Sequence, residues 1–418
     1  MTTISKVQDI FSQTLIAFQL PAFRWLWLAS VFGAMAFAAQ NLAMGWLVLE
    51  TTDSAFWVGA VGATSGVGQV GFGVFAGVLL DRYDKRRVLM IGQLLTALIP
   101  LAVGLLVFTD QVALWHLLLV NLFIGVLGSI RAPAFNTINY QLVGQKRILN
   151  ASAAMNMGHS LASILSPLVT GVLIDQRGQS SGFFLATGFG LIGVCFIWLI
   201  SGSFRSKPLN ETILESAAAG IRYIWHHAKL RKLLSLSLIG ETFGFSFHVM
   251  MPVVAREVLG LGATGLGTLS AARGIGATLG TLVVASLGDF RRKGLLLVGS
   301  VTGAGIFMIL FGLSPWFYVS LVAVAILGGM MTTYDITMKA LILMLAGDKW
   351  RGRVQAIYTL TYGFVSLGGF LAGSIASLIG VSFTLAINGS VLVTFINVFS
   401  SSFRGMVAED SAEIDDEQ

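Results

Sequence analysis

The sequence predicts an all-α membrane protein of twelve transmembrane helices, arranged as two pseudo-symmetric six-helix halves. Three observations support this prediction: an apolar composition, twelve recurring apolar stretches, and a charged motif that occurs once in each half. Of the 418 residues, 55% are hydrophobic and only 11% are charged, and the mean hydropathy is +0.82. Soluble domains have about a quarter of their residues charged, so we expect most of this surface to face lipid.

Twelve apolar stretches are each long enough to cross about 30 Å of hydrocarbon as a helix. Their continuous apolarity argues against a barrel, whose strands would alternate in character over about ten residues. We place the spans at residues 25–49, 56–80, 88–108, 114–140, 150–174, 182–202, 233–255, 264–288, 294–314, 317–344, 355–379 and 382–402.

The positions of the basic residues predict the orientation. Most of the 26 Lys and Arg residues fall in segments that are cytoplasmic if both termini are cytoplasmic, whereas the external loops contain only Arg177 and Arg256. This is the positive-inside bias of membrane proteins. The net charge of +6 therefore reflects topology, and we expect no nucleic-acid partner. Residues 1–20 lack a cleavable signal. The absence of an organelle-targeting segment and the compact loops favour a multi-pass protein of the bacterial inner membrane.

A charged turn occurs in each half. Asp81 ends the second span ahead of basic residues, and Asp289 does the same after the eighth; Gly144 and Gly347 open a second matched pair of basic turns. We therefore predict four parts: an N-terminal half (1–202), a linker with an amphipathic helix on the cytoplasmic lipid surface (203–232), a C-terminal half (233–404) and an acidic cytoplasmic tail (405–418).

The turn after the second span resembles the signature of the major facilitator superfamily. Residues 77–86, GVLLDRYDKR, follow the pattern G-x-L-x-D-R-x-G-R-K, except that Asp84 stands at the second glycine. In that superfamily these charges tie helix ends together at the cytoplasmic side and stabilise one conformation. The alternative is a cluster of charges that only sets topology. The resemblance implies a conformational-switch loop made of Gly77, Asp81, Arg82, Lys85, Arg86 and, in the second half, Asp289.

Four further stretches matter for the family: residues 23–27, 130–134, 220–223 and 351–354. They resemble the branch of the superfamily that contains the enterobactin exporter and macrolide efflux proteins. The resemblance covers essentially the whole chain and implies a transporter fold.

Superfamily antiporters often have the pattern G-x8-G-x3-G-P-x2-G-G in span five. Pro167 and Gly171 of this pattern are present here, and other small residues fill the remaining positions. This favours export over import.

Five ionisable residues lie inside predicted spans, where each costs several kcal/mol unless it is paired or hydrated. We expect them to line a central cavity between the halves. In this interpretation Glu241 and Asp335 are candidate proton carriers, and Arg131 and Arg273 hold an anionic group or compete with the proton. Lys339 follows Asp335 at i+4, so a purely structural ion pair is the alternative.

Three polar residues inside spans, Gln40, Asn41 and Asn136, are further candidates for substrate contact. The alternative is that they form hydrogen bonds with neighbouring helices. We expect no cofactor: residues 66–71 match the dinucleotide pattern G-x-G-x-x-G, but they lie in the middle of a span without the required strand. We expect no metal site either, since no set of His, Cys and acidic residues with ligand spacing is present.

These observations together predict a secondary active transporter and not an enzyme. We expect a monomer in contact with membrane lipids that exports a small amphipathic compound, such as a drug or siderophore, by alternating access with proton antiport. A lipid flippase and a symport-type importer are the alternatives within transport. A non-transporting membrane receptor or assembly protein is the alternative from another class.

Overall fold

The computed structural model describes residues 17–145, 147–202, 204, 213–287, 290, 292–347 and 350–400, and every regular element within them is a helix. Eleven helical segments in this part of the chain are long and apolar enough to cross a membrane. They coincide with eleven of the predicted spans. The second predicted span is present as a helix of 28 residues, 55–82, which is about 42 Å long at ~1.5 Å per residue.

The described elements follow one another in chain order with short connections. They are η1 (Ala17–Gln19), α2 (Pro21–Thr52), α3 (Ala55–Arg82), α4 (Lys85–Phe108), α5 (Leu114–Val143), α6 (Ile148–Arg177), α7 (Ser180–Trp198), α8 (Ile213–His226), α9 (Ala228–Ile239), the π-helical turn η2 (Gly240–Gly244), α10 (Ser246–Val253), the π-helical turn η3 (Val254–Val258), α11 (Ala263–Leu287), α12 (Lys293–Leu313), α13 (Phe317–Leu345), α14 (Arg351–Thr361), α15 (Gly363–Ile379) and α16 (Val381–Val398).

The contacts divide the chain into two compact units. Unit 1 consists of Met1–Leu47 and Val67–Leu209, and unit 2 consists of Val48–Gly66 and Asn210–Gln418. The helices α2 and α3 therefore each run from one unit into the other, and the turn that joins them belongs to unit 2. The division of the sequence into halves at residues 202 and 233 stays a prediction.

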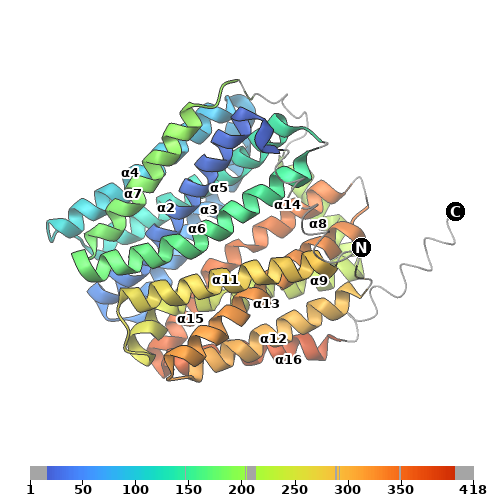
Figure 1. The fold of residues 1–418 in the computed structure, drawn as a ribbon. Coiled ribbons are helices and arrows are strands. Elements are labelled where there is room, and N and C mark those ends of the chain that lie inside the picture. Colours follow the sequence, from blue (N-terminus) through green and yellow to red (C-terminus); the bar gives the residue numbers. More distant parts are fainter. Residues whose placement is uncertain are drawn as a thin grey trace. The chain divides into compact units, whose positions relative to one another are not determined.

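In unit 1, α4 packs against α5 and α7, and α6 packs against α5 and α7 (Figure 1). Small side chains on α6 let it approach α2 closely. The Trp27 indole donates to the carbonyl of Ala154 at 2.7 Å, and Ser166 Oγ donates to the carbonyl of Met35 at 2.6 Å. A Cβ on Gly158 would lie 3.1 Å from the Trp27 indole nitrogen. Small residues and interhelical hydrogen bonds are the usual basis of such packing in lipid.

Unit 2 has a tighter seam between two of its spans. The helix α11 lies along α13, and α12 lies between α13 and α16 (Figure 1). A Cβ on Gly276 of α11 would lie only 1.7 Å from the carbonyl oxygen of Ala325, and one on Gly280 would lie 2.4 Å from that of Gly329. Backbone therefore contacts backbone here, as in other small-xxx-small helix pairs.

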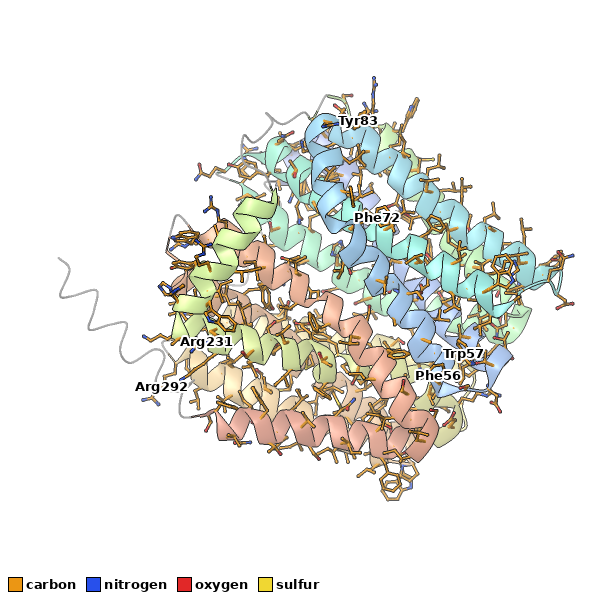
Figure 2. The ribbon with its side chains drawn as sticks, turned by 180° about the vertical axis from the view of Figure 1, so that it is seen from behind. Phe56, Trp57, Phe72, Tyr83, Arg231 and Arg292 are labelled. Carbon is orange, nitrogen blue, oxygen red and sulfur yellow. The ribbon has the colours of Figure 1, made fainter. Side chains whose placement is uncertain are left out.

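The turn between α2 and α3 is fastened to unit 2 by an aromatic contact and a charged one. Phe56, at the start of α3 (Figure 2), meets the ring of Phe370 on α15 edge to face at 5.8 Å. The guanidinium of Arg256 lies 3.2 Å from the Asp53 carboxylate and also donates to the carbonyl of Leu49 at 2.9 Å. These contacts join the segment 48–66 to α15 and to the end of span seven.

The linker contains the predicted amphipathic helix, α8. The Tyr223 ring stacks on Trp350 at 4.6 Å, and its hydroxyl accepts a hydrogen bond from the backbone N–H of Gly347 at 3.3 Å. Trp225 is 68% exposed, and the guanidinium of Arg231 lies 5.9 Å from the centre of its ring. Arg231 itself is labelled in Figure 2. One face of α8 is therefore covered by the segment around α14, and contact of the other face with lipid stays a prediction. The predicted tail, 405–418, lies outside the described residues.

Candidate functional site

Span seven is not a continuous α-helix. Two π-helical turns, η2 and η3, interrupt it before and after α10. A π-turn inserts one extra residue into the helical hydrogen-bond ladder, and such turns occur frequently at functional sites. Two glycines, Gly240 and Gly244, begin and end the first turn, and α13 packs against both: a Cβ on Gly244 would lie 2.7 Å from the methyl carbon of Met331.

The first π-turn contains Glu241, one of the predicted proton carriers. Its side chain is fully buried, and neither carboxylate oxygen has a hydrogen-bond partner among the described residues. Burying an ionised carboxylate without a partner costs several kcal/mol, whereas a protonated one can be buried at a much smaller cost. The protonation state of Glu241 is therefore closely linked to the stability of the surrounding helices.

The second predicted carrier, Asp335 on α13, lies in a network of donors. Lys339 Nζ is 2.8 Å from Oδ2, while the hydroxyls of Tyr362 and Tyr358 donate to Oδ1 at 2.6 and 3.0 Å. The Lys339 ammonium also lies 5.4 Å from the centre of the Tyr362 ring. Three donors converging on one carboxylate stabilise its ionised form, so the predicted Asp335–Lys339 ion pair exists and two tyrosines reinforce it.

Tyr334, the neighbour of Asp335 in sequence, packs against the π-turn that carries Glu241, and its hydroxyl has no hydrogen-bond partner among the described residues. Tyr334 is fully buried, and its ring lies against the π-turn so closely that a Cβ on Gly240 would be 2.4 Å from the hydroxyl oxygen. We call Glu241, Asp335, Lys339 and the three tyrosines, Tyr334, Tyr358 and Tyr362, the carboxylate cluster of unit 2.

Unit 1 contains a polar cavity of about 280 Å³ between α2, α5 and α6. Two predicted site residues, Arg131 and Asn136, line it together. A larger hollow of about 590 Å³ runs along α16 but is lined by no ionisable group, so it is a groove in an apolar surface. The residues around the polar cavity are Ser30, Gly33, Arg131, Ala132, Phe135, Asn136, Asn139, Met155 and His159.

The structure brings together some of the predicted residues and separates others. Arg273 lies on α11, where its Cγ would be 3.0 Å from a Cβ on Gly328. Gln40 is buried, with its Nε2 atom unpaired among the described residues, and Asn41 is exposed. Neither of these two lines the polar cavity. Because Arg131 belongs to unit 1 and the carboxylate cluster to unit 2, a single cavity shared by all five ionisable residues stays a prediction.

The structure explains why the predicted switch loop has Asp84 where the superfamily signature has a glycine. Asp84 is the N-cap of α4: its Oδ1 accepts from the backbone N–H groups of Arg86 and Arg87 at 3.0 and 3.2 Å. Its Oδ2 accepts from the N–H of Phe204 at 2.8 Å. A glycine could make none of these side-chain bonds. Asp84 therefore fixes the start of α4 and holds the segment that follows α7.

The basic residues of this loop differ in their surroundings. Arg86 donates to the carbonyls of Ile197 and Trp198, the end of α7, at 3.4 and 2.6 Å, where a cation is favoured by the helix dipole. Lys85 is buried and Arg82 is exposed. Gly77 and Asp81 lie within α3, but their surroundings and the whole of Asp289 are outside what the structure describes. A switching role for the loop stays a prediction.

In span five, Pro167 and Gly171 are both buried on α6, and Ser166 makes the bond to α2 described above. Sequence reasoning missed the two tyrosines that donate to Asp335. Tyr358 and Tyr362 stand four residues apart in span eleven, a spacing that puts both on one helix face and could have marked them. Within the described residues, no group of three or more His, Cys, Asp or Glu side chains could hold a metal ion.

Comparison with known proteins agrees with this architecture. Residues 12–416 match the transmembrane secretion effector family. The enterobactin exporter EntS of Escherichia coli O1:K1 / APEC is 26% identical over 395 residues, which cover 92% of this chain and 94% of that protein. The same exporter from E. coli strain SMS-3-5 is 26% identical over 406 residues, covering 94% of this chain and 96% of that protein.

Solved structures show the same fold at low identity. A bacterial homologue of the human lysosomal transporter Spinster, in an inward-facing and unoccupied conformation, gives a TM-score of 0.74 at 14% identity and covers 93% of this chain and 98% of that one. The nucleoside transporter NupG gives 0.69 at 16% identity, covering 92% of this chain and 98% of that one. The chain therefore belongs to the transmembrane secretion effector family of the major facilitator superfamily and is a membrane transporter, not an enzyme.

Proposed function

We propose that this protein exports a small amphipathic compound across the bacterial inner membrane in exchange for protons, by alternating access. In this proposal both termini face the cytoplasm, as the distribution of Lys and Arg favours, and the chain works as a monomer among membrane lipids. The observation that carries proton coupling is Glu241: a fully buried carboxylate without a partner among the described residues, placed on a π-turn in the middle of a span.

Glu241 would bind the proton that enters from outside and release it to the cytoplasm. A buried site of this kind can alternate between a protonated state in a dry environment and an ionised state when water reaches it. The close contact between Gly240 and Tyr334 links any movement of the π-turn to α13. Proton binding would in this way bias the arrangement of the spans, which is the requirement for coupling.

In this proposal Asp335 has a different role from Glu241. With three donors on its carboxylate, Asp335 supplies a fixed negative charge, and Lys339 is the mobile positive charge next to it. The ammonium of Lys339 can stay on Asp335 while Glu241 is protonated and move toward Glu241 when the proton leaves. A lysine side chain, with its flexible four-carbon stem, is well suited to such an exchange.

The relatives support export as the direction and siderophores as the first substrates to test, since they are named for export of enterobactin. The substrate itself is part of the proposal. Lipid flipping and uptake by symport are the competing functions within transport. A non-transporting receptor or assembly role is disfavoured, because relatives across the whole length of the chain are transporters.

The test uses inside-out vesicles that contain a pH-sensitive dye. Respiration acidifies the lumen, and enterobactin, other siderophores, macrolides, cationic dyes and lysolipids are then added one at a time. We expect at least one compound to raise the lumenal pH as it enters in exchange for protons. Vesicles with the Glu241→Gln variant, present in equal amount, should give no such response.

Two outcomes would contradict the proposal. If no compound in the panel moves protons through abundant, folded protein, proton antiport loses its support. If a compound is transported equally well by wild type and by Glu241→Gln without any pH response, the protein is an exporter or flippase with another driving force.

A further inference from the structure

The polar cavity of unit 1 contains a cation, Arg131, that forms no ion pair with the described residues of unit 1. Arg131, on α5, makes two contacts in the described structure: Nη1 lies 3.4 Å from the carbonyl oxygen of Gly33, and the guanidinium lies 5.8 Å from the centre of the Phe37 ring. The first is longer than a normal N–H···O bond. Neither contact neutralises the charge.

The helices around the cavity offer no carboxylate that could do so. The helix α5 contains no acidic residue, α6 contains only Asp175, and α2 contains only Glu50, which follows the cavity residue Gly33 by roughly 26 Å at about 1.5 Å per residue. Asp175 follows His159, the nearest cavity residue on that helix, by roughly 24 Å at about 1.5 Å per residue. A guanidinium at membrane depth costs several kcal/mol unless an anion or water compensates it.

Asn136 offers a donor for an anionic ligand, whereas Asn139 contributes a buried Oδ1 acceptor without a hydrogen-bond partner among the described residues. The amide of Asn136 faces the same space as Arg131, and amide N–H groups donate to oxygen anions. His159 is held by Ser30, with Nε2 and Oγ 2.8 Å apart, so its ring is oriented and not free to turn away. A guanidinium binds carboxylate or phosphate oxygens in a two-pronged geometry that few other groups can satisfy.

The size and the apolar wall of the cavity restrict the ligand further. A volume of about 280 Å³ is at the small end of the range for ligand pockets, so it admits a small compound or the anionic end of a larger one. Phe135 and Met155 form the apolar part of the lining. The fitting group is therefore a small anion attached to an apolar or aromatic body.

We propose that the polar cavity of unit 1 is an anion subsite, in which Arg131 and Asn136 bind the carboxylate of an amphipathic, aromatic substrate. This names a substrate class for the export function and rests on that proposed function. A lipid phosphate presents similar chemistry, and the test below separates the two sources.

The experiment measures binding, which needs neither a proton gradient nor transport. Purified full-length protein in a non-ionic detergent is titrated with benzoate by isothermal calorimetry. We expect saturable binding that weakens at least tenfold in Arg131→Gln and that Arg131→Lys partly restores. The matched control is Arg87→Gln, which removes an exposed cation of the same unit and should leave binding unchanged. Benzamide, the uncharged analogue, should not compete.

Several results would overturn the anion subsite. They are an absence of saturable benzoate binding to wild type, equal affinity in wild type and in Arg131→Gln, or effective competition by benzamide. Displacement of benzoate by short-chain phosphatidylglycerol but not by other aromatic carboxylates would assign the cavity to a lipid headgroup and overturn the substrate assignment. Glu241→Gln should bind benzoate normally, so a failure of proton coupling is distinguishable from a failure of this site.

Discussion

Neutralising the Asp335–Lys339 pair one residue at a time and then together separates a structural role from a coupling role. Removing one partner of a fully buried pair costs about 3–5 kcal/mol, whereas an exposed pair contributes about 0–1 kcal/mol. The side chains of Asp335 and Lys339 are 23% and 39% exposed, between these limits. We therefore expect Asp335→Asn to lower the free energy of unfolding by about 1–3 kcal/mol, because Lys339 is left without its partner.

The double variant Asp335→Asn/Lys339→Gln should recover part of that loss, because it removes both charges. At roughly 1–2 °C per kcal/mol for a chain of this size, Asp335→Asn should lower the apparent melting temperature by about 2–5 °C. Tryptophan fluorescence at one fixed scan rate measures these shifts. Tyr358→Phe is the matched control: it deletes the longest bond to Asp335, 3.0 Å, without changing any charge, and should have a smaller effect.

Proton-coupled transport by the same variants gives the second readout. If Asp335 has a coupling role, the double variant regains stability but not proton-driven transport. If transport returns together with stability, the pair is structural only and the assignment of Asp335 is wrong. If the stability losses of the two single variants simply add in the double variant, the two side chains do not interact and the reasoning from their geometry is refuted.

Two further predictions concern stability at the ends of helices. Arg256→Gln loses both the bond to Leu49 and the pair with Asp53, whereas Asp53→Asn loses only an exposed pair worth about 0.2–1 kcal/mol. We therefore expect Arg256→Gln to lower the melting temperature more than Asp53→Asn does. Equal shifts would contradict this ranking. Asp84→Gly, which installs the superfamily's glycine, should cost about 1–3 kcal/mol, mostly because the N–H of Phe204 loses its acceptor, since glycine at an N-cap costs only a few tenths of a kcal/mol. A variant as stable as wild type in thermal unfolding would show that the cap contributes nothing.

The positions of the spans could be predicted from the sequence because lipid requires long apolar helices with internally satisfied backbone. The π-turn around Glu241 could not, because an extra residue in the hydrogen-bond ladder leaves no periodic signal in composition. The contact at its start is tertiary as well, because Gly240 fits against the buried Tyr334, about ninety positions along the chain. A single sequence shows which residues are small or charged, but not which of them will meet.

The donors to Asp335 illustrate the same limit. Lys339 could be paired with it in advance because i, i+4 residues on a helix are neighbours, whereas Tyr358 and Tyr362 reach it from another span. Asp84 was visible as a departure from a motif, and its capping role could have been inferred from its place just before a helix. Arg131 and Asn136 could be singled out as polar residues within a span, but the cavity they share depends on how α2, α5 and α6 pack.

The most direct test of proton coupling compares two modes of transport in proteoliposomes that contain Glu241→Gln and a substrate identified in the vesicle screen. Accumulation driven by a pH gradient requires the proton carrier, whereas exchange of labelled for unlabelled substrate at equal pH does not. We predict that Glu241→Gln loses gradient-driven accumulation and retains exchange, while Asp84→Asn, a conservative change outside the carboxylate cluster, retains both. Gradient-driven accumulation at the wild-type level in Glu241→Gln would contradict the assignment of Glu241 as the proton carrier.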